Sequence, residues 1–451
     1  MPDLSSNLCG IRGPNPFWLA SGPPTNTAGQ VCRAFEAGWG GAVWKTITDQ
    51  PITNVASRYG GIGLGNQRLM GMNNIELISD RTLEDNLRDI AEVKRRFPDH
   101  PLVVSLMVES TREAWRSIVR RAEDAGADGV ELNFGCPHGM NERGMGSAVG
   151  QVAEYAELIT GWAKEAAHVP VLVKLTPNVT SIVEIGRAAA RGGADAISLI
   201  NTLNSIMGVD LDTFAPQPQV AGQGTHGGYC GPAVKPIALH MVAALSRDAA
   251  TRVPISAIGG VRRWSDAAEF LLLGAVNVQV CTAVMHRGFG VIKHMLRGLN
   301  DWMTAKGFER LDDFRGRSIE RITTWGELDL NYRVVADIDE STCIHCGICY
   351  ASCEDGCYQA ISWDKLPLAE YVAKFGAPPK KLRGEAAPAL ALAAESQEMV
   401  DVFRVREADC VGCNMCELAC PVEGCVTMRE VASDQPAESW NERQRRLRNE
   451  T

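Results

Sequence analysis

Eight cysteines in the last quarter of the chain form two runs with one shared spacing. The first run is Cys343, Cys346, Cys349 and Cys353, and the second is Cys410, Cys413, Cys416 and Cys420, with Pro421 directly after. Each run reads C-x2-C-x2-C-x3-C, in which two-residue gaps let one tight loop supply three of the four soft thiolates of a [4Fe–4S] cluster. The spacing therefore predicts that this end of the chain folds around iron–sulfur clusters and carries electrons.

The spacing also favours iron–sulfur clusters over zinc. A zinc ribbon uses pairs of C-x2-C and is the alternative, but two matching four-cysteine runs ending in Cys-Pro are typical of bacterial two-cluster ferredoxins. In those proteins the fourth cysteine of each run ligates the other cluster. We therefore expect one cluster on Cys343, Cys346, Cys349 and Cys420, and the second on Cys410, Cys413, Cys416 and Cys353.

Composition and charge narrow the class of protein. The length of 451 residues predicts about two to three domains. A formal net charge of −9 argues against nucleic acid as a partner, because neutralising phosphates needs a basic face. The N-terminal MPDLSSNLCGIRGPNPFW has no secretory pattern, and the longest apolar stretch, FLLLGAVNVQV, is too short to span a bilayer. We therefore expect a cytoplasmic protein with no membrane partner.

The first 330 residues alternate short apolar runs with amphipathic segments. The runs resemble parallel strands buried on both faces, and we expect them at Phe17–Ser21, Ala42–Thr46, Leu102–Met107, Val130–Asn133, Val171–Leu175, Ala196–Ile200, Pro254–Ala257 and Val276–Val280. Helical patterns between them include Thr82–Phe97, Thr111–Ala125, Gln151–Ala167 and Ser181–Arg191. Eight such strand–helix units predict a (β/α)8 TIM barrel over residues 1–330, with a doubly wound open sheet as the alternative.

The residues just past these strands lie where a barrel enzyme places its chemistry, at the carboxyl ends, and many of them are polar. They are Ala20-Ser21, Lys45-Thr46, Asn133, Lys174, Asn201-Thr202, Gly259-Gly260 and Cys281-Thr282. A buried lysine is stable only opposite a charge or dipole, although each lysine alone could simply extend to the surface. Gly231 and the Gly259-Gly260 pair offer bare backbone for a phosphate near the last strands. Together these residues predict FMN, with Lys174 near its N1–C2 carbonyl.

The segment NFGCPHGMNERGMGS, residues 133–147, places Cys136 on a loop flanked by glycines. Glycines at both ends suit a closing lid, and a thiol over a flavin could exchange a proton with a substrate carbon. An incidental loop cysteine is the alternative. We expect the neighbouring His138 to be exposed.

The barrel pattern ends near residue 330. We expect residues 331–430 to form a small α+β ferredoxin-like domain with two clusters, interrupted at about 364–400 by an Ala/Pro-rich surface insert with a short helix. Residues 431–451 end in ESWNERQRRLRNET, which is charged and nearly devoid of apolar side chains. They predict a solvated or disordered tail, with a partner-binding tail as the alternative.

Longer motifs resemble a known family. NIELISDRT, ELNFGCPHGMNERGMG, LVKLTPNVT, GGYCGPAVKPIAL and VCTA, followed by both cysteine runs, are similar to dihydropyrimidine dehydrogenase in its bacterial form, over nearly the whole chain. The resemblance implies that Cys136 is the general acid/base at pyrimidine C5. It implies substrate contacts from Asn74, Glu76, Asn133, Asn201 and Thr202. It implies FMN contacts from Ala20, Ser21, Lys45, Thr46, Lys174, Gly231, Ile258, Gly259, Gly260, Cys281 and Thr282. Many family members have Ser before the catalytic Cys, where this chain has Gly135, so one substrate hydrogen bond is expected to be missing or replaced by water.

The resemblance also implies a reaction and a partner. Uracil or thymine would be reduced to the 5,6-dihydropyrimidine, with Cys136 protonating C5. The only G-x-G-x-x-G, at residues 222–227, follows a polar, proline-containing stretch rather than a strand, so we expect no dinucleotide site in this chain. Electrons from NAD(P)H would then arrive through a separate FAD- and NAD(P)H-binding iron–sulfur subunit. The resemblance implies a dimer of this chain within such a heterotetramer.

Two other functions compete with this interpretation. A dihydroorotate dehydrogenase would use a similar FMN barrel, but we expect Glu76 to repel the carboxylate of orotate and to accept hydrogen bonds from uracil. A pure electron-transfer module would need neither the strand-end lysines and asparagines nor the Cys136 loop.

Overall fold

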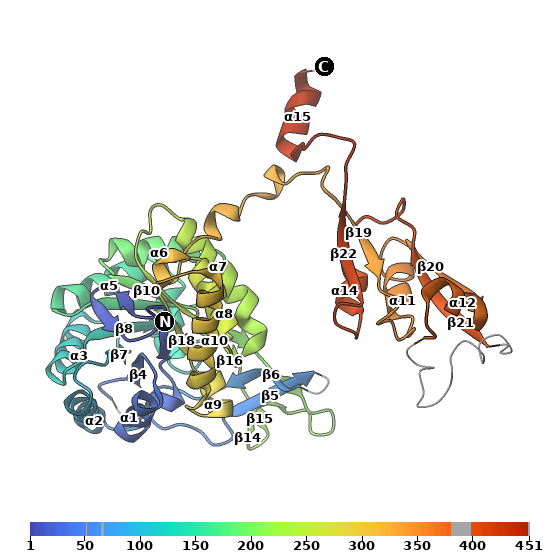
Figure 1. The fold of residues 1–451 in the computed structure, drawn as a ribbon. Coiled ribbons are helices and arrows are strands. Elements are labelled where there is room, and N and C mark those ends of the chain that lie inside the picture. The colour runs from blue at the N-terminus through green and yellow to red at the C-terminus, as the bar shows by residue number, and fades with distance from the viewer. Residues whose placement is uncertain (51, 65–66, 380–397, 450–451) are drawn as a thin grey trace. The chain divides into compact units, whose positions relative to one another are not determined.

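The chain folds into two compact units, Met1–Ile322 and Thr323–Thr451 (Figure 1). The computed structural model describes all residues except 51, 65–66, 380–397 and 450–451. The units divide after Ile322, whereas the sequence predicted a boundary after residue 330. Among the described residues, no helix combines the length and the apolar character needed to cross a bilayer.

The first unit is a closed barrel of eight parallel strands in the order β10-β17-β18-β3-β4-β7-β8-β9. The strands are β3 (Phe17–Leu19), β4 (Gly41–Ile47), β7 (Leu102–Leu106), β8 (Gly129–Phe134), β9 (Val171–Leu175), β10 (Ala196–Leu199), β17 (Ile255–Ile258) and β18 (Asn277–Val280). Pairing of β18 with β3 closes the sheet, so the predicted TIM barrel is confirmed and the open-sheet alternative is wrong.

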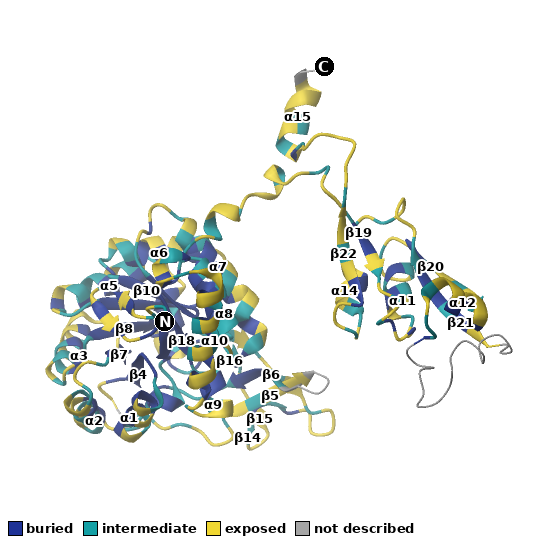
Figure 2. Cartoon of the chain, in the orientation of Figure 1, coloured by how far each residue is buried: buried dark blue, intermediate teal, exposed yellow. Residues whose placement is uncertain are grey.

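Helices surround the barrel (Figure 1). They are α1 (Ala28–Ala37), α2 (Leu83–Arg96), α3 (Arg112–Asp124), α5 (Ala153–Ala166), α6 (Ile182–Arg191), α7 (Lys235–Arg247), α8 (Trp264–Leu272), α9 (Thr282–Arg287) and α10 (Val291–Lys306). Side chains of Thr82, Thr111 and Ser181 cap α2, α3 and α6 by accepting a backbone N–H of the first turn. Figure 2 shows the buried strands inside and exposed residues on the outer helix faces, which is the pattern expected of a two-sided buried sheet.

A short hairpin closes the amino end of the barrel. Strands β1 (Ser6–Leu8) and β2 (Ile11–Gly13) pair with each other, and Leu8 and Ile11 pack in one cluster with Trp18, Val43 and Val103 from the strands. The apolar cluster fills this end, so the open carboxyl end is left for a ligand.

A second sheet lies in the loops that follow the barrel strands. Its order is β11-β16-β6-β5, with β5 (Tyr59–Leu64), β6 (Gln67–Asn74), β11 (Leu203–Ser205) and β16 (Gly227–Cys230). Antiparallel pairing of Gly228 with Asn74 joins a segment after β4 to a segment after β10. The two-residue strands β12 to β15, between residues 208 and 224, form small hairpins in the same excursion. No sequence pattern predicted this sheet.

The second unit contains two antiparallel strand pairs and short helices, as the α+β prediction required. Strand β19 (Arg333–Ile338) pairs with β22 (Val426–Val431), and β20 (Ile361–Pro367) pairs with β21 (Met399–Val405). The helices are α11 (Ile348–Glu354), α12 (Leu368–Phe375) and α14 (Met415–Ala419). The expected insert at 364–400 therefore begins as strand and helix, and its Ala/Pro-rich part at 380–397 lies outside the described residues.

The C-terminal residues differ from the expected disordered tail, because residues 440–449 form helix α15 (Trp440–Asn449). Ser439 caps the helix: its hydroxyl accepts from the Glu442 N–H at 3.3 Å, and Glu442 accepts from the Ser439 N–H at 2.7 Å. Trp440 packs on Trp325, with ring centroids 5.9 Å apart. A capping box and one aromatic contact thus order a segment whose average composition predicts disorder.

Candidate active site

A cavity of about 630 Å³ opens at the carboxyl end of the barrel. All the barrel residues predicted for a site line it: Ala20, Ser21, Lys45, Thr46, Asn74, Glu76, Asn133, Cys136, Lys174, Asn201, Thr202, Gly231, Ile258, Gly259, Gly260, Cys281 and Thr282. They come from strand ends and from the β6–β16 sheet. The volume is within the range of sites for small ligands and cofactors.

A chain of amide and hydroxyl groups crosses one wall of the cavity. Asn133 Nδ2 donates to Thr46 Oγ1 at 3.0 Å, and Asn201 Nδ2 donates to Asn133 Oδ1 at 3.0 Å. Asn201 Oδ1 in turn accepts from the Thr202 N–H at 2.8 Å. These contacts fix the amide orientations, so the wall presents ordered donors and acceptors of the kind that bind a planar amide.

Gly135 makes this arrangement possible. A Cβ built on Gly135 would lie 2.4 Å from both Cβ and Nδ2 of Asn201. A serine at this position would therefore displace Asn201 from its contact with Asn133. Glycine at position 135 thus permits the close packing of Asn201, a predicted substrate-binding residue.

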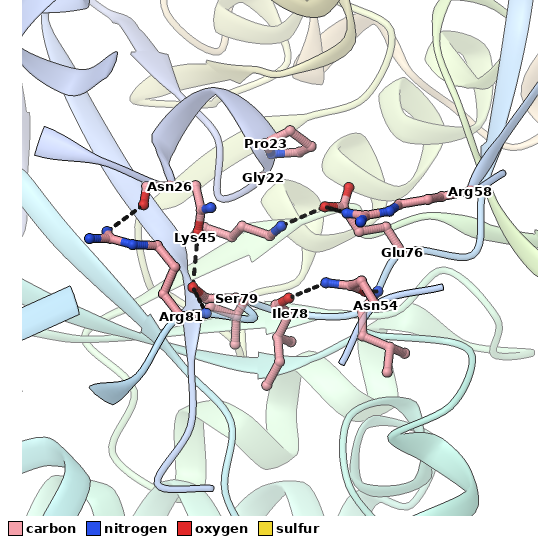
Figure 3. A network of polar contacts seen from close by, with 12 residues as sticks. Gly22, Pro23, Asn26, Lys45, Asn54, Arg58, Glu76, Ile78, Ser79 and Arg81 are labelled. Carbon is pink, nitrogen blue, oxygen red and sulfur yellow. Dashed lines mark hydrogen bonds and ion pairs between the residues drawn. The ribbon is translucent and has the colours of Figure 1, made fainter. Parts of the chain in front are cut away.

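Glu76 is the centre of a charged network at the cavity (Figure 3). Its Oε1 lies 2.7 Å from Lys45 Nζ and 3.1 Å from an Arg58 guanidinium nitrogen, and its Oε2 accepts from the Tyr59 hydroxyl. Asn54 holds the loop just after Glu76 by accepting from the Leu77 N–H at 2.7 Å. Two cations against one carboxylate leave the group with net positive charge. Glu76 is therefore expected to repel an anionic pyrimidine less than a free carboxylate would, because Lys45 and Arg58 more than offset its negative charge.

Cys136 lies buried on the loop after β8. Its Sγ is 3.6 Å from the backbone oxygen of His138. Burial raises the pKa of the Cys136 thiol to about 11, with Lys174 acting in the opposite direction. The thiol is therefore protonated at neutral pH, which is the form that a proton donor needs.

The loop around Cys136 is held by its own polar contacts. His138 is buried rather than exposed, so that prediction is wrong: its Nε2 donates to the backbone oxygen of Glu76 at 3.0 Å. His226 Nε2 donates to the Pro137 oxygen at 3.0 Å. Gly146 has φ 58°, and a Cβ there would lie 2.8 Å from the Cys136 oxygen. Glycine thus lets the chain turn tightly against the cysteine.

Glycines also line the cavity. Gly259 and Gly260 have φ of 133° and 75°, and a Cβ on Gly260 would lie 2.7 Å from the Cβ of Lys235. Gly231 has φ 99° and precedes Pro232, which opens a short turn (Pro232–Val234) before α7. Bare backbone at these three positions fits a phosphate group. The residues present therefore fit FMN.

Several residues of the site were not predicted. Tyr59 and Arg262 line the cavity, and Glu131 lies behind Lys174, with Lys174 Nζ 3.8 Å from Glu131 Oε1. Glu131 could have been found, because it is two residues before Asn133 on the same strand and so faces the same side. No local sequence signal marks Tyr59, which reaches the cavity only through the β5–β6 hairpin.

Two smaller cavities in the second unit are lined by cysteines. One is lined by Cys343, Cys346, Cys349, Cys420 and Cys425, and the other by Cys353, Cys357, Cys410, Cys413 and Cys416. Each cavity therefore brings together three cysteines of one run and the fourth cysteine of the other. The donor set of soft thiols fits [4Fe–4S] clusters. Cys357 and Cys425, to which the sequence assigned no role, give each cavity a fifth thiol.

Fold and site together define an oxidoreductase in which a TIM-barrel ligand site and an iron–sulfur domain share one chain. Residues 3–303 match the family model "Dihydroorotate dehydrogenase", and residues 342–424 match "4Fe-4S dicluster domain". The chain belongs to the dihydroorotate dehydrogenase family.

Its relatives include enzymes named for pyrimidine chemistry. The chain is 39% identical over 364 residues to the NAD-dependent dihydropyrimidine dehydrogenase subunit PreA of Escherichia coli K12, covering 80% of this chain and 88% of the relative. It is 42% identical over 338 residues to the chloroplastic dihydropyrimidine dehydrogenase (NADP(+)) of Arabidopsis thaliana, covering 72% and 79%. It is 35% identical over 326 residues to the catalytic subunit of dihydroorotate dehydrogenase B (NAD(+)) of Thermococcus kodakarensis, covering 70% and 98%.

Proposed function

We propose that this chain reduces uracil and thymine to 5,6-dihydropyrimidines, using FMN in the barrel and two [4Fe–4S] clusters in the second unit. The observation that carries the proposal is the buried Cys136 thiol in a cavity whose wall is an ordered amide network. The named relatives support the same substrate class.

The chain's own residues have distinct roles in this reaction. Asn133 and Asn201 would bind the pyrimidine amide edges through their fixed side-chain amides, together with Asn74, Glu76 and Thr202. Cys136 would deliver the proton to C5, and burial would exclude competing water from the thiol.

Cofactor binding would divide between the two units. The residues that would hold FMN are Ala20, Ser21, Lys45, Thr46, Lys174, Gly231, Ile258, Gly259, Gly260, Cys281 and Thr282. FMN would supply the hydride for C6. The clusters, bound by Cys343, Cys346, Cys349 and Cys420 and by Cys410, Cys413, Cys416 and Cys353, would supply electrons singly. We propose that these come from NAD(P)H through a partner subunit with FAD, in a heterotetramer containing a dimer of this chain.

Reduction of orotate is the second candidate. It is favoured by the net positive charge around Glu76, where the two cations Lys45 and Arg58 face a single carboxylate. A dihydroorotate dehydrogenase catalytic subunit is also among the relatives.

One experiment separates the two candidates. The purified protein is reduced anaerobically, then mixed with uracil, thymine or orotate while flavin absorbance is followed. We expect reoxidation by uracil and thymine only. Reoxidation by orotate alone would contradict the proposal, and the absence of a flavin spectrum would contradict FMN binding itself.

A further inference from the structure

A fully buried carboxylate lies directly behind the barrel cavity. Glu131 on β8 is 0% exposed, whereas its neighbours Lys174 and Gln279 both line the cavity. No step of the proposed reaction uses Glu131. A charge in this position is costly, because a barrel interior is usually filled by branched apolar side chains.

The two oxygens of Glu131 have different surroundings. Oε2 accepts from Ser198 Oγ at 2.6 Å and from Gln279 Nε2 at 3.4 Å. Oε1 has no hydrogen-bond partner among the described residues and lies 3.8 Å from Lys174 Nζ. The ammonium is therefore attracted to the carboxylate without being hydrogen bonded to it, so its N–H groups remain available to a ligand in the cavity.

Strand register fixes this arrangement. Lys174 on β9 pairs with Asn133 on one side and with Ser198 on the other. Ser198 pairs in turn with Ser256 on β17, whose hydroxyl accepts from Gln279 Nε2 at 2.9 Å. The polar groups thus form one continuous layer inside the barrel, held by several strands. Such a layer can hold a charge in place without reorganising during a reaction.

We propose that Glu131 is a positioning residue that holds the Lys174 ammonium at the inner wall of the cavity and lowers the reduction potential of the flavin bound there. The inference rests on the proposed FMN binding. Reduction adds negative charge to a flavin, which a cation stabilises and a nearby carboxylate opposes. Glu131 therefore sets how much of the Lys174 charge acts on the cavity, whatever the detailed pose of the flavin.

The test is the flavin midpoint potential of the FMN-loaded Glu131→Gln variant, measured by equilibrium titration against reference dyes. Gln keeps the size of Glu and can still accept from Ser198. In Glu131→Gln we expect the affinity for reduced FMN, divided by the affinity for oxidised FMN, to rise on the order of tenfold. The flavin midpoint potential therefore moves in the positive direction. Ser256→Ala is the matched control, since it alters the same layer without touching Glu131, and its potential should equal that of wild type.

A purely structural Glu131 would leave the potential of Glu131→Gln unchanged, and that result would overturn the proposal. If this variant does not fold, Ser198→Ala is measured instead. Loss of the short hydrogen bond leaves the carboxylate charge less dispersed, so the potential should fall, and an unchanged value would overturn the proposal equally. A wild-type protein that binds no FMN would overturn the proposed function, which is a distinguishable result.

Discussion

The barrel cavity and the cysteine cavities are assembled from very different stretches of chain. Each cysteine cavity takes three thiols from one seven-residue segment and a further ligand candidate from the other run. The barrel cavity takes single residues from strand ends and from a sheet whose segments are more than 150 residues apart, as Asn74 and Gly228 are. A site built from one short segment therefore depends on residue spacing, whereas a site built from distant segments depends on the whole fold.

The two regions also differ in how a single substitution would affect cofactor binding. In the second unit the loss of one ligand thiol would remove a quarter of the protein ligands of a proposed cluster. In the barrel a single substitution leaves the other groups in place, because they are held by different strands. Variants in one region should therefore leave the cofactor of the other intact, and the following predictions test this separation.

The largest expected effect concerns the electron supply. Purified alone, the chain should reduce uracil with dithionite-reduced viologen but not with NADH, because the proposed route from nicotinamide passes through another subunit. Uracil consumption under anaerobic conditions measures both rates. Full turnover with NADH and no partner would contradict the two-subunit proposal and remove the need for the clusters.

Next in size is the loss of one cluster. Cys353→Ser should abolish the cluster anchored by Cys410, Cys413 and Cys416, and leave the other, because the proposed ligation is crossed. Iron content should fall by about half, and EPR of the reduced protein should show one cluster instead of two. The matched control is Cys357→Ser, which alters a thiol of the same cavity that we do not assign as a ligand. Retention of the second-run cluster in Cys353→Ser, with loss of the first-run cluster, would show that ligation is not crossed.

Replacement of the proposed proton donor should have a smaller effect. Cys136→Ala should keep FMN and both clusters but lose about 10²-fold or more in uracil turnover, because only proton transfer is removed. Cys136→Ser should retain a trace, since a hydroxyl is a weaker acid than a thiol. Cofactor spectra confirm that each variant is loaded. Turnover at the wild-type rate in Cys136→Ala would exclude Cys136 as the acid.

The raised pKa of Cys136 gives the two directions of the reaction different pH dependences. Below a pKa of about 11 the thiol is the major form, so reduction of uracil should not be limited by its deprotonation between pH 6 and 9. The reverse reaction needs the thiolate, whose fraction rises about tenfold per pH unit in this range. Initial rates of dihydrouracil oxidation at fixed ionic strength test this. A pH-independent reverse rate would show that another group is the base.

Particular residues show how far the sequence could predict these sites. The position of Lys45, Asn133 and Lys174 at one cavity could be predicted because parallel strands all end at one mouth, and a strand end can be recognised from apolar spacing. Glu131 was missed although its spacing from Asn133 implied the same orientation, because a buried strand offers no alternation to mark its inner face.

Other features were beyond local reasoning. Tyr59 and Arg58 contact Glu76 because the sheet of β5, β6, β11 and β16 brings them together, and no sequence pattern predicted the pairing of these strands. His138 was expected to be exposed, and its burial follows from a contact with the backbone of Glu76, 62 residues earlier. Helix α15 forms because Ser439 and Glu442 cap it, a local signal that average composition conceals.

The smallest expected effect comes from Glu76, and it bears on which pyrimidine the barrel accepts. Glu76→Gln should weaken uracil binding by about 1–3 kcal/mol, the cost of replacing a charged acceptor of a buried N–H by a neutral one. The same change leaves Lys45 and Arg58 without their counter-charge, so binding of orotate should become tighter. Arg58→Gln is the matched control, since it alters the same network and should change the affinities for both pyrimidines in the opposite directions. Isothermal titration of the oxidised protein with each pyrimidine gives both affinities. If Glu76→Gln binds uracil as tightly as wild type, the carboxylate serves only as a counter-charge for Lys45 and Arg58. Substrate choice must then depend on the amide wall of Asn133 and Asn201, whose close contact Gly135 permits.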